Sequence, residues 1–200
     1  MSEFFAVLSL VVWGATVLTI VLALIHRSSP DSAAGLLFED ISRSSLWLAF
    51  LVALGTMLGS LYLSEVAHFT PCPLCWYQRI CMYPLSVALL VGGIRRDRFV
   101  YTYILPPAII GAAIAIYHTQ LQAFPKQAGP FCDAQELCKA RYIYEWGFVS
   151  IPFMSLSAFC FIIVMMFLLR SNRDAEFDDD LPDDENDNTD ALSVSAQGVA

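Results

Sequence analysis

Long uninterrupted runs of apolar residues dominate the chain. Five segments contain no Asp, Glu, Lys or Arg, and they cover residues 4–25, 46–64, 80–94, 99–117 and 147–169. A helix needs about 20 predominantly apolar residues to cross the hydrocarbon core of a bilayer. The pattern therefore predicts five transmembrane helices.

The third apolar segment is the shortest of the five, and polar residues precede it. Extending it back to Cys75 gives it the length of a membrane span. This extension draws Gln78 and Arg79 into the first turns of the predicted helix. We therefore expect a helix over about residues 75–94, with Cys75 close to the membrane interface.

The composition agrees with a membrane protein. Hydrophobic residues make up 57% of the 200 residues and charged residues 15%, and the mean hydropathy is +0.59. Soluble domains are about 45–50% apolar and about 25% charged. These values exclude an ordinary soluble domain, and they favour lipid rather than nucleic acid as the surroundings of the chain.

The net charge of −8 arises mainly from the C-terminus. Residues 174–190 contain ten of the 19 acidic residues and few apolar ones. Such a segment cannot bury enough apolar surface to fold. We therefore expect residues 171–200 to form an acidic, disordered cytoplasmic tail that is separate from the catalytic part.

The distribution of basic residues predicts the orientation in the membrane. Seven of the 11 Lys and Arg residues fall on one side of the predicted spans: Arg27, Arg43, Arg95, Arg96, Arg98, Arg170 and Arg173. The side richer in Lys and Arg is usually cytoplasmic. We expect an exterior N-terminus, a cytoplasmic loop over residues 28–45, a cytoplasmic C-terminus, and cysteine-bearing loops outside, where disulfides persist.

Cys72 and Cys75 lie at the start of the third span, in the run Pro-Cys-Pro-Leu-Cys-Trp-Tyr-Gln-Arg that ends at Arg79. Proline is favoured at the first helical position, so Pro73 makes Cys72 the expected N-cap. The positive end of a helix stabilises a thiolate. Arg79 follows Cys75 by one helical turn and adds a fixed positive charge. We predict Cys75 to be the thiolate that meets an electron acceptor in the membrane.

A second cysteine pair, Cys132 and Cys138, lies in the polar loop before the last span. This pair is either a structural staple or a relay that exchanges disulfides with the first pair. The four cysteines could also supply the four ligands that a structural zinc site needs. Thiolates in an oxidising compartment tend to oxidise, however, so we expect no metal. A static disulfide in the first pair is a further alternative. Cys81 and Cys160 lie in apolar segments and are expected to be buried and inert.

The run from Pro71 to Ile80 closely resembles the signature of DsbB-type disulfide bond formation proteins, particularly the short-loop BdbC-like branch. Tyr117-His118, followed by Gln122, is similar to that family's Tyr-His element. The run Gly-Phe-Val-Ser-Ile-Pro-Phe at residues 147–153 resembles the start of its last helix.

The resemblance covers residues from about 46 to 169, and it implies an all-α integral membrane protein. Residues 46–170 would form a four-helix transmembrane bundle, with helices over about 46–64, 75–94, 99–117 and 147–169. Family members usually have four helices, so residues 1–27 would be an additional N-terminal transmembrane helix. The protein would be located in the plasma membrane.

The resemblance also implies a quinone-coupled thiol oxidase. A thioredoxin-fold dithiol carrier outside the membrane would attack a Cys132–Cys138 disulfide, by analogy through Cys132. The electrons would then pass to a Cys72–Cys75 disulfide, with Cys72 as the partner in interchange and Cys75 next to the quinone. Only five residues separate Cys132 from Cys138, which leaves a short loop for the partner to dock on.

The same resemblance implies which residues bind the quinone, of the ubiquinone or menaquinone type. Arg79 would polarise a quinone oxygen, His118 would bind the ring or relay protons, and Gln78 would complete the site. The resulting quinol would pass its electrons to the respiratory chain.

Three other functions remain open from the sequence. A vitamin K epoxide reductase-like enzyme also joins a membrane Cys-x-x-Cys to a quinone, but its loop cysteines come first in the sequence. An electron conduit that runs in the opposite direction would differ only in its reduction potentials. A non-enzymatic membrane scaffold would use its disulfides only to brace exterior loops.

Overall fold

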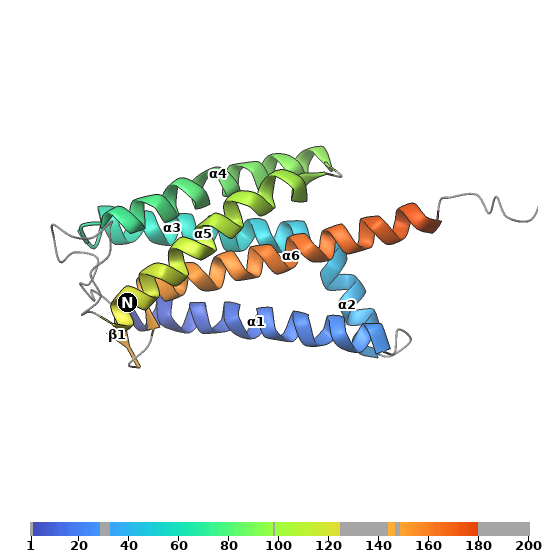
Figure 1. The fold of residues 1–200 in the computed structure, drawn as a ribbon, viewed down its shortest axis with the longest axis horizontal. Helices are drawn as coiled ribbons and strands as arrows, with labels where there is room; N and C mark the ends of the chain where they lie inside the picture. Colours follow the sequence, from blue (N-terminus) through green and yellow to red (C-terminus); the bar gives the residue numbers. More distant parts are fainter. Residues whose placement is uncertain (1, 29–32, 98, 125–143, 147–148, 180–200) are drawn as a thin grey trace, which may run out of the picture.

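The computed structural model describes residues 2–28, 33–97, 99–124, 144–146 and 149–179. Figure 1 shows long helices lying side by side along one axis, with a shorter helix crossing near one end. The long helices are α1 (Ser2–Ser28), α3 (Ser45–Glu65), α4 (Pro73–Arg95), α5 (Val100–Ala123) and α6 (Ile151–Asp179). The short helix α2 (Ala33–Arg43) follows α1, and the strands β1 (Tyr144–Glu145) and β2 (Val149–Ser150) precede α6.

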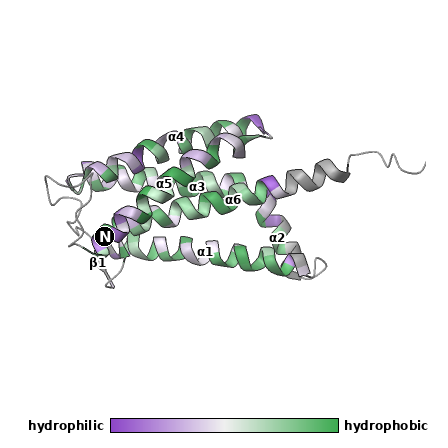
Figure 2. Cartoon of the chain, in the orientation of Figure 1, coloured by the Kyte–Doolittle hydropathy of each residue, from purple (hydrophilic) through white to green (hydrophobic). Residues whose placement is uncertain are grey.

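The five long helices confirm the five predicted spans. Each is long and apolar enough to cross a membrane: Glu3–His26, Ser45–Glu65, Pro73–Arg95, Val100–Ala123 and Ile151–Ser171. Figure 2 shows apolar residues along most of their length. Large apolar side chains also face outward, such as Leu51, which is 60% exposed, and Ile80, which is 63% exposed. The chain is an all-α, multi-pass membrane protein.

The structure changes some of the predicted helix boundaries. Helix α5 continues past Tyr117 to Ala123, which brings the polar residues of its last turns into regular helix. Helix α6 begins at Ile151 rather than at residue 147, because β2 pairs with β1 in an antiparallel ladder. It ends at Asp179 rather than at residue 169. Residues 180–200, the rest of the predicted acidic tail, lie outside the described residues.

One end of the bundle collects the predicted site residues that the structure describes. The N-terminal ends of α1, α4 and α6 and the C-terminal ends of α3 and α5 lie there, on the left of Figure 1. Because Cys72 and Cys75 belong to this end, we call it the cysteine end. The N-terminus of α1 and the reactive pair therefore share one side of the bundle, as the sequence predicted.

The core of the bundle is packed closely enough to position side chains at the cysteine end. Phe159 of α6 and Leu85 of α4 are almost completely buried. Helix α5 approaches α6 at Gly111, where an added Cβ would overlap the ring of Phe159. Small residues allow membrane helices to approach closely, and this contact fixes the spacing of the two helices.

A Gly111→Ala substitution should destabilise the bundle by about 1–3 kcal/mol, the usual cost of overpacking a core. The ring of Phe159 is 0% exposed and has little room to move away from the new methyl group. The thermal unfolding midpoint in detergent measures the effect. Gly14→Ala is the matched control, because a Cβ at Gly14 meets nothing within 4 Å. Equal midpoints for the two variants would contradict the close packing of α5 on α6.

Candidate functional site

The site begins with the cap of helix α4. Cys72 has extended backbone angles (φ −75°, ψ 166°), and Pro73 is the first helical residue, as the sequence predicted. The Cys72 Sγ accepts a hydrogen bond of 3.3 Å from the backbone N–H of Cys75. A sulfur therefore occupies the place that a Ser or Asp oxygen takes at most helix N-termini.

The two sulfurs of the pair lie close together as free thiols. Their Sγ atoms are 3.1 Å apart, within hydrogen-bond distance of each other. Cys72 is 3% exposed, whereas Cys75 is partly buried. A small apolar cluster that includes Leu74 and Leu121 surrounds them. Their proximity is compatible with the disulfide that the sequence predicted between them, and that disulfide stays a prediction.

His118 of α5 adds a second contact to the sulfur of Cys72. Its Nε2 lies 3.7 Å from the Cys72 Sγ, and its Nδ1 lies 3.2 Å from Nε2 of Gln78. The amide nitrogen of Gln78 can only donate, so Nδ1 is the acceptor and the neutral ring carries its proton on Nε2. All three side chains are buried. Gln78 thus fixes the tautomer that points an N–H at Cys72.

These contacts stabilise negative charge on Cys72. The pKa of Cys72 is lowered from 9.0 to about 4, chiefly because the Cys75 thiol donates a hydrogen bond to its sulfur. His118 lowers it further, whereas burial acts in the opposite direction. The sequence predicted the thiolate at Cys75. In the reduced protein the lowered pKa places the negative charge on Cys72, and the role of Cys75 as the thiolate that meets the acceptor stays a prediction.

The lowered pKa predicts an unusual pH dependence for the reduced protein. The Cys72 thiolate should persist as the pH falls from 9 and disappear only through about pH 4. Ultraviolet absorbance of the thiolate, taken as the difference between the parent and Cys72→Ser, measures this. Cys75→Ala should raise the midpoint, whereas Cys75→Ser retains a hydroxyl donor and should raise it less. A midpoint near the ordinary thiol value of about 8.5 would contradict the proposed hydrogen bonding.

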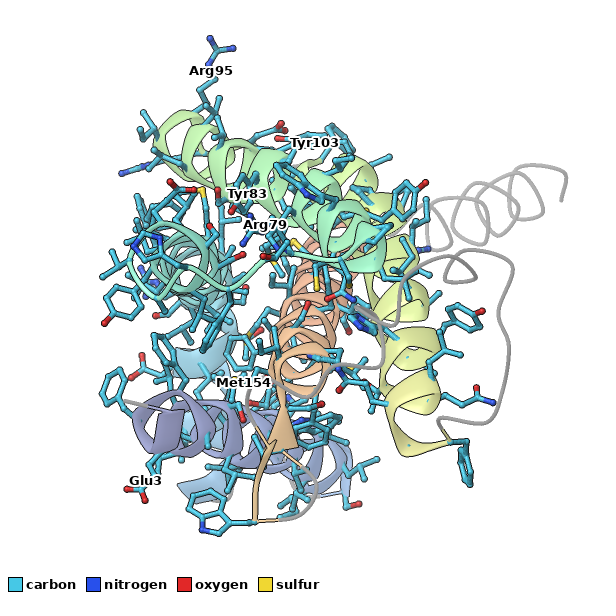
Figure 3. All side chains as sticks on the ribbon, turned by 90° about the vertical axis from the view of Figure 1, so that its left-hand side faces the viewer. Glu3, Arg79, Tyr83, Arg95, Tyr103 and Met154 are labelled. Carbon is cyan, nitrogen blue, oxygen red and sulfur yellow. The ribbon has the colours of Figure 1, made fainter. Side chains whose placement is uncertain are left out.

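Arg79 lies one helical turn after Cys75 on α4, and its hydrogen bonds join α4 to α3. Its Nε donates to Ser60 Oγ at 2.9 Å, and its Nη2 donates to the Ser60 carbonyl oxygen at 2.8 Å. The guanidinium carbon lies 5.5 Å from the ring centroid of Trp76. These contacts hold the guanidinium of Arg79, labelled in Figure 3, at a cavity that Cys72 and Cys75 also line.

A cavity of about 370 Å³ opens beside these groups, between α1, α3, α4, α5 and α6. Cys72, Cys75, Gln78, Arg79 and His118 line one part of it, and mostly apolar side chains line the rest. The sulfurs of Cys72 and Cys75 therefore adjoin a mostly apolar space.

The cavity also holds a polar atom that has no partner. The hydroxyl oxygen of Tyr83 is buried, and it makes no hydrogen bond within the described part of the chain. Tyr83 and Arg79 project from α4 one turn apart (Figure 3). A buried hydroxyl without a partner is costly unless a ligand or water satisfies it. The cavity can therefore supply a hydrogen bond to a bound molecule.

The structure brings together five of the seven predicted site residues: Cys72, Cys75, Gln78, Arg79 and His118. The other two, Cys132 and Cys138, lie outside the described residues, so their pairing and their roles stay predictions. Cys81 and Cys160 are free and do not line the cavity.

Sequence reasoning missed two contributors to the site. Tyr83 follows Arg79 by four residues and Cys75 by eight, so helical periodicity could have placed it on the same face. Ser60 had no comparable signal, because its importance depends on how α3 packs against α4.

The site also contains three soft or borderline metal ligands. The donor atoms of Cys72, Cys75 and His118 all lie within 4.8 Å of one another. Structural zinc sites use four protein ligands, and this cluster offers three among the residues that the structure describes. Cys132 and Cys138, the other ligands of the zinc alternative, lie outside the described residues, so the absence of a metal stays a prediction.

Comparisons with known proteins identify relatives of this arrangement. The family model described as disulfide bond formation protein DsbB matches residues 42–170. Disulfide bond formation protein C of Bacillus subtilis is 46% identical over 129 residues, which cover 64% of this chain and 94% of the relative. A probable disulfide formation protein C of Halalkalibacterium halodurans is 43% identical over 123 residues, which cover 60% of this chain and 89% of the relative. A probable disulfide formation protein of Coxiella burnetii is 37% identical over 143 residues, covering 69% and 97%. No solved structure matches the chain significantly.

Proposed function

We propose, because this chain belongs to the DsbB family of disulfide bond formation proteins, that it reoxidises a dithiol carrier and delivers the electrons to a membrane quinone. Membership in the family implies oxidoreductase activity in the formation of disulfide bonds. The carrier, the quinone and the order of the steps belong to the proposal. The observation that carries it is the opening of the Cys72 and Cys75 pair onto a cavity beside Arg79 and His118.

The proposed reaction moves two electrons and two protons. A thiolate of the reduced carrier, a thioredoxin-fold dithiol protein, attacks the Cys132–Cys138 disulfide, and its second thiol resolves the mixed disulfide. The carrier is then oxidised and the loop pair is reduced. The loop pair in turn reduces a Cys72–Cys75 disulfide by the same exchange. The reduced Cys72 and Cys75 pair would then pass two electrons and two protons to a quinone and return to the disulfide, and the quinol would carry the electrons to the respiratory chain.

The two cysteines of the first pair have separate tasks in this proposal. Cys72 exchanges disulfides with the loop pair, and Cys75 lies next to the quinone. While both are reduced, the lowered pKa of Cys72 places the negative charge on its sulfur. Once Cys72 enters a mixed disulfide, its charge is lost, and Cys75 can carry the negative charge near the guanidinium of Arg79.

The residues present fit a quinone. A ligand site is usually a mostly apolar cavity with a few convergent polar groups, and the volume of about 370 Å³ falls in the usual range. A quinone ring carries carbonyl oxygens that accept hydrogen bonds. The guanidinium of Arg79 and the unpartnered hydroxyl of Tyr83 are donors at the cavity. His118, held by Gln78, keeps an N–H directed at Cys72 and can move a proton at that atom.

The orientation in the membrane belongs to the same proposal. The cysteine end faces the exterior, where the carrier is found, and α2 faces the cytoplasm. The excess of Lys and Arg near the opposite end of the bundle supports this orientation. The proposed location is the plasma membrane.

Turnover of the purified protein tests the function. Quinone-free protein in detergent is mixed with a reduced thioredoxin-fold protein and a soluble quinone, and quinone absorbance and free thiols are followed together. We expect one quinone to be lost for each dithiol oxidised, and no oxidation without quinone. A scaffold would leave both reagents unchanged. Reduction of an oxidised carrier by quinol, without the forward reaction, would show that the electrons run the other way.

A further inference from the structure

Helix α1 forms part of the cavity although it lies outside the family match. The match begins at residue 42, whereas α1 covers Ser2–Ser28. Phe5, Leu8, Ser9 and Val12 of α1 line the cavity. Their spacing of three and four residues places them on one face of the helix. We call these four residues the α1 wall.

Contacts on both sides hold the α1 wall in place across the cavity. The ring of Phe5 lies 6.0 Å from the ring of Tyr62 on α3. Gly59 of α3 leaves room for it, since an added Cβ there would lie 3.2 Å from Phe5 Cε1. Further along α1, Trp13 stacks on Phe153 of α6 with centroids 5.9 Å apart. Helix α1 therefore spans from α3 to α6, below the space between them in Figure 3.

The α1 wall differs chemically from the opposite side of the cavity. The α4 and α5 side presents a guanidinium and an imidazole, from Arg79 and His118. The α1 wall presents hydrocarbon: the hydroxyl of Ser9, its only polar side-chain group, donates to the carbonyl oxygen of Ala6 at 3.0 Å. A bound molecule would therefore direct its polar groups toward α4 and α5 and its apolar part toward α1.

We propose that the α1 wall binds the apolar side chain of the quinone, whose ring lies beside Cys75 and Arg79. The inference rests on the proposed function and extends it. Helix α1 is then part of the quinone site, and it sets the preference for quinones that carry a chain. Removing this contact should weaken the binding of a quinone with a chain and spare the same ring without one.

Adjacent valines provide a matched pair of variants. Val12 lines the cavity, whereas Val11 is 61% exposed and does not line it. Val12→Trp fills the α1 wall with a bulky ring, and Val11→Trp places the same ring on the outer face of the same helix. The readout is the rise in thermal unfolding midpoint on adding quinone, because a ligand that binds the folded protein stabilises it. This readout does not depend on turnover.

Two quinone probes distinguish the contribution of the apolar chain to binding from that of the ring. One is a benzoquinone that carries a decyl chain, and the other is the same ring without the chain. In Val12→Trp, we expect the decyl quinone to be needed at about tenfold or higher concentration for the same rise in midpoint. The chainless quinone should differ from the parent by less than about twofold, and Val11→Trp should match the parent with both probes.

The possible outcomes separate this inference from the proposed function. If the parent reduces quinone and both Trp variants respond to the decyl quinone alike, the α1 wall does not bind the quinone chain. The inference is then wrong, and the proposed function stands. If the parent reduces no quinone, both the inference and the proposed function are wrong. Should Val12→Trp not fold, Val12→Ala replaces it, and it should weaken the decyl-quinone response about threefold relative to Val11→Ala. Equal responses of the two Ala variants would overturn the inference.

Discussion

A Cys75→Ser variant should lose quinone reduction by about 10³-fold or more, because the first pair can no longer form a disulfide. A serine hydroxyl can still form a hydrogen bond with the Cys72 sulfur, which lies 3.1 Å from the Cys75 Sγ, so the structure of the helix end should be retained. Cys72 keeps its sulfur and should accumulate in a mixed disulfide that nothing resolves. Quinone absorbance measures the loss of activity, and non-reducing electrophoresis detects the trapped species.

Cys81→Ser is the matched control for this prediction. Cys81 lies on the same helix and is free, but it does not line the cavity. Its substitution should leave turnover within about twofold of the parent, as expected for a residue away from the chemistry. The relay through the first pair would be wrong if Cys75→Ser oxidised the carrier as fast as the parent.

An Arg79→Met variant should lower kcat/KM for quinone by about 10²-fold, which corresponds to about 2.7 kcal/mol of lost stabilisation. The guanidinium is a fixed positive charge at the cavity that adjoins Cys75, and negative charge would develop there on the quinone oxygens as they accept the electrons. A methionine of similar length fills the space without the charge. Arg79→Lys should recover part of the activity, since it restores the charge without the planar fork.

Two further variants separate charge from packing. Ser60→Ala removes the Oγ acceptor of Arg79 but keeps the carbonyl acceptor and the charge. It should cost much less activity than Arg79→Met. Arg95→Met removes an exposed charge at the other end of α4 and should have no effect on quinone kinetics. An equal loss in Ser60→Ala and Arg79→Met would show that Arg79 acts only by joining α3 to α4.

The sequence predicted the membrane spans well, because the hydrocarbon core demands long apolar helices and leaves a strong pattern. The exact ends of the helices were harder to predict from the sequence than the helices themselves. The extension of α5 past Tyr117 includes polar residues such as His118 and Gln122, whose burial depends on the neighbouring helices. The β1–β2 ladder that delays the start of α6 involves only two residues in each strand, too few for a periodic signal.

For the candidate site too, features set by neighbouring residues could be predicted from the sequence, whereas features set by distant residues could not. The cap formed by Cys72 and Pro73 follows from local rules of helix termini, and the sequence predicted it. The distribution of charge between Cys72 and Cys75 was not accessible from the sequence, because it depends on the contact between the two sulfurs and on His118, 46 positions further along. Local rules do not reach such partners.

The capping role of Cys72 couples the redox state of the pair to the stability of a helix end. As a thiolate, its sulfur accepts the N–H of Cys75 and holds the first turn of α4. In a disulfide the sulfur is neutral and a weaker acceptor, so oxidation loosens that turn, by a fraction of the roughly 0.5–2 kcal/mol that an N-cap contributes. By linkage, whatever holds the first turn firmly favours the reduced pair. The reduction potential of the pair is thus set partly by backbone rigidity, and amide hydrogen exchange at the start of α4 should be faster in the oxidised protein.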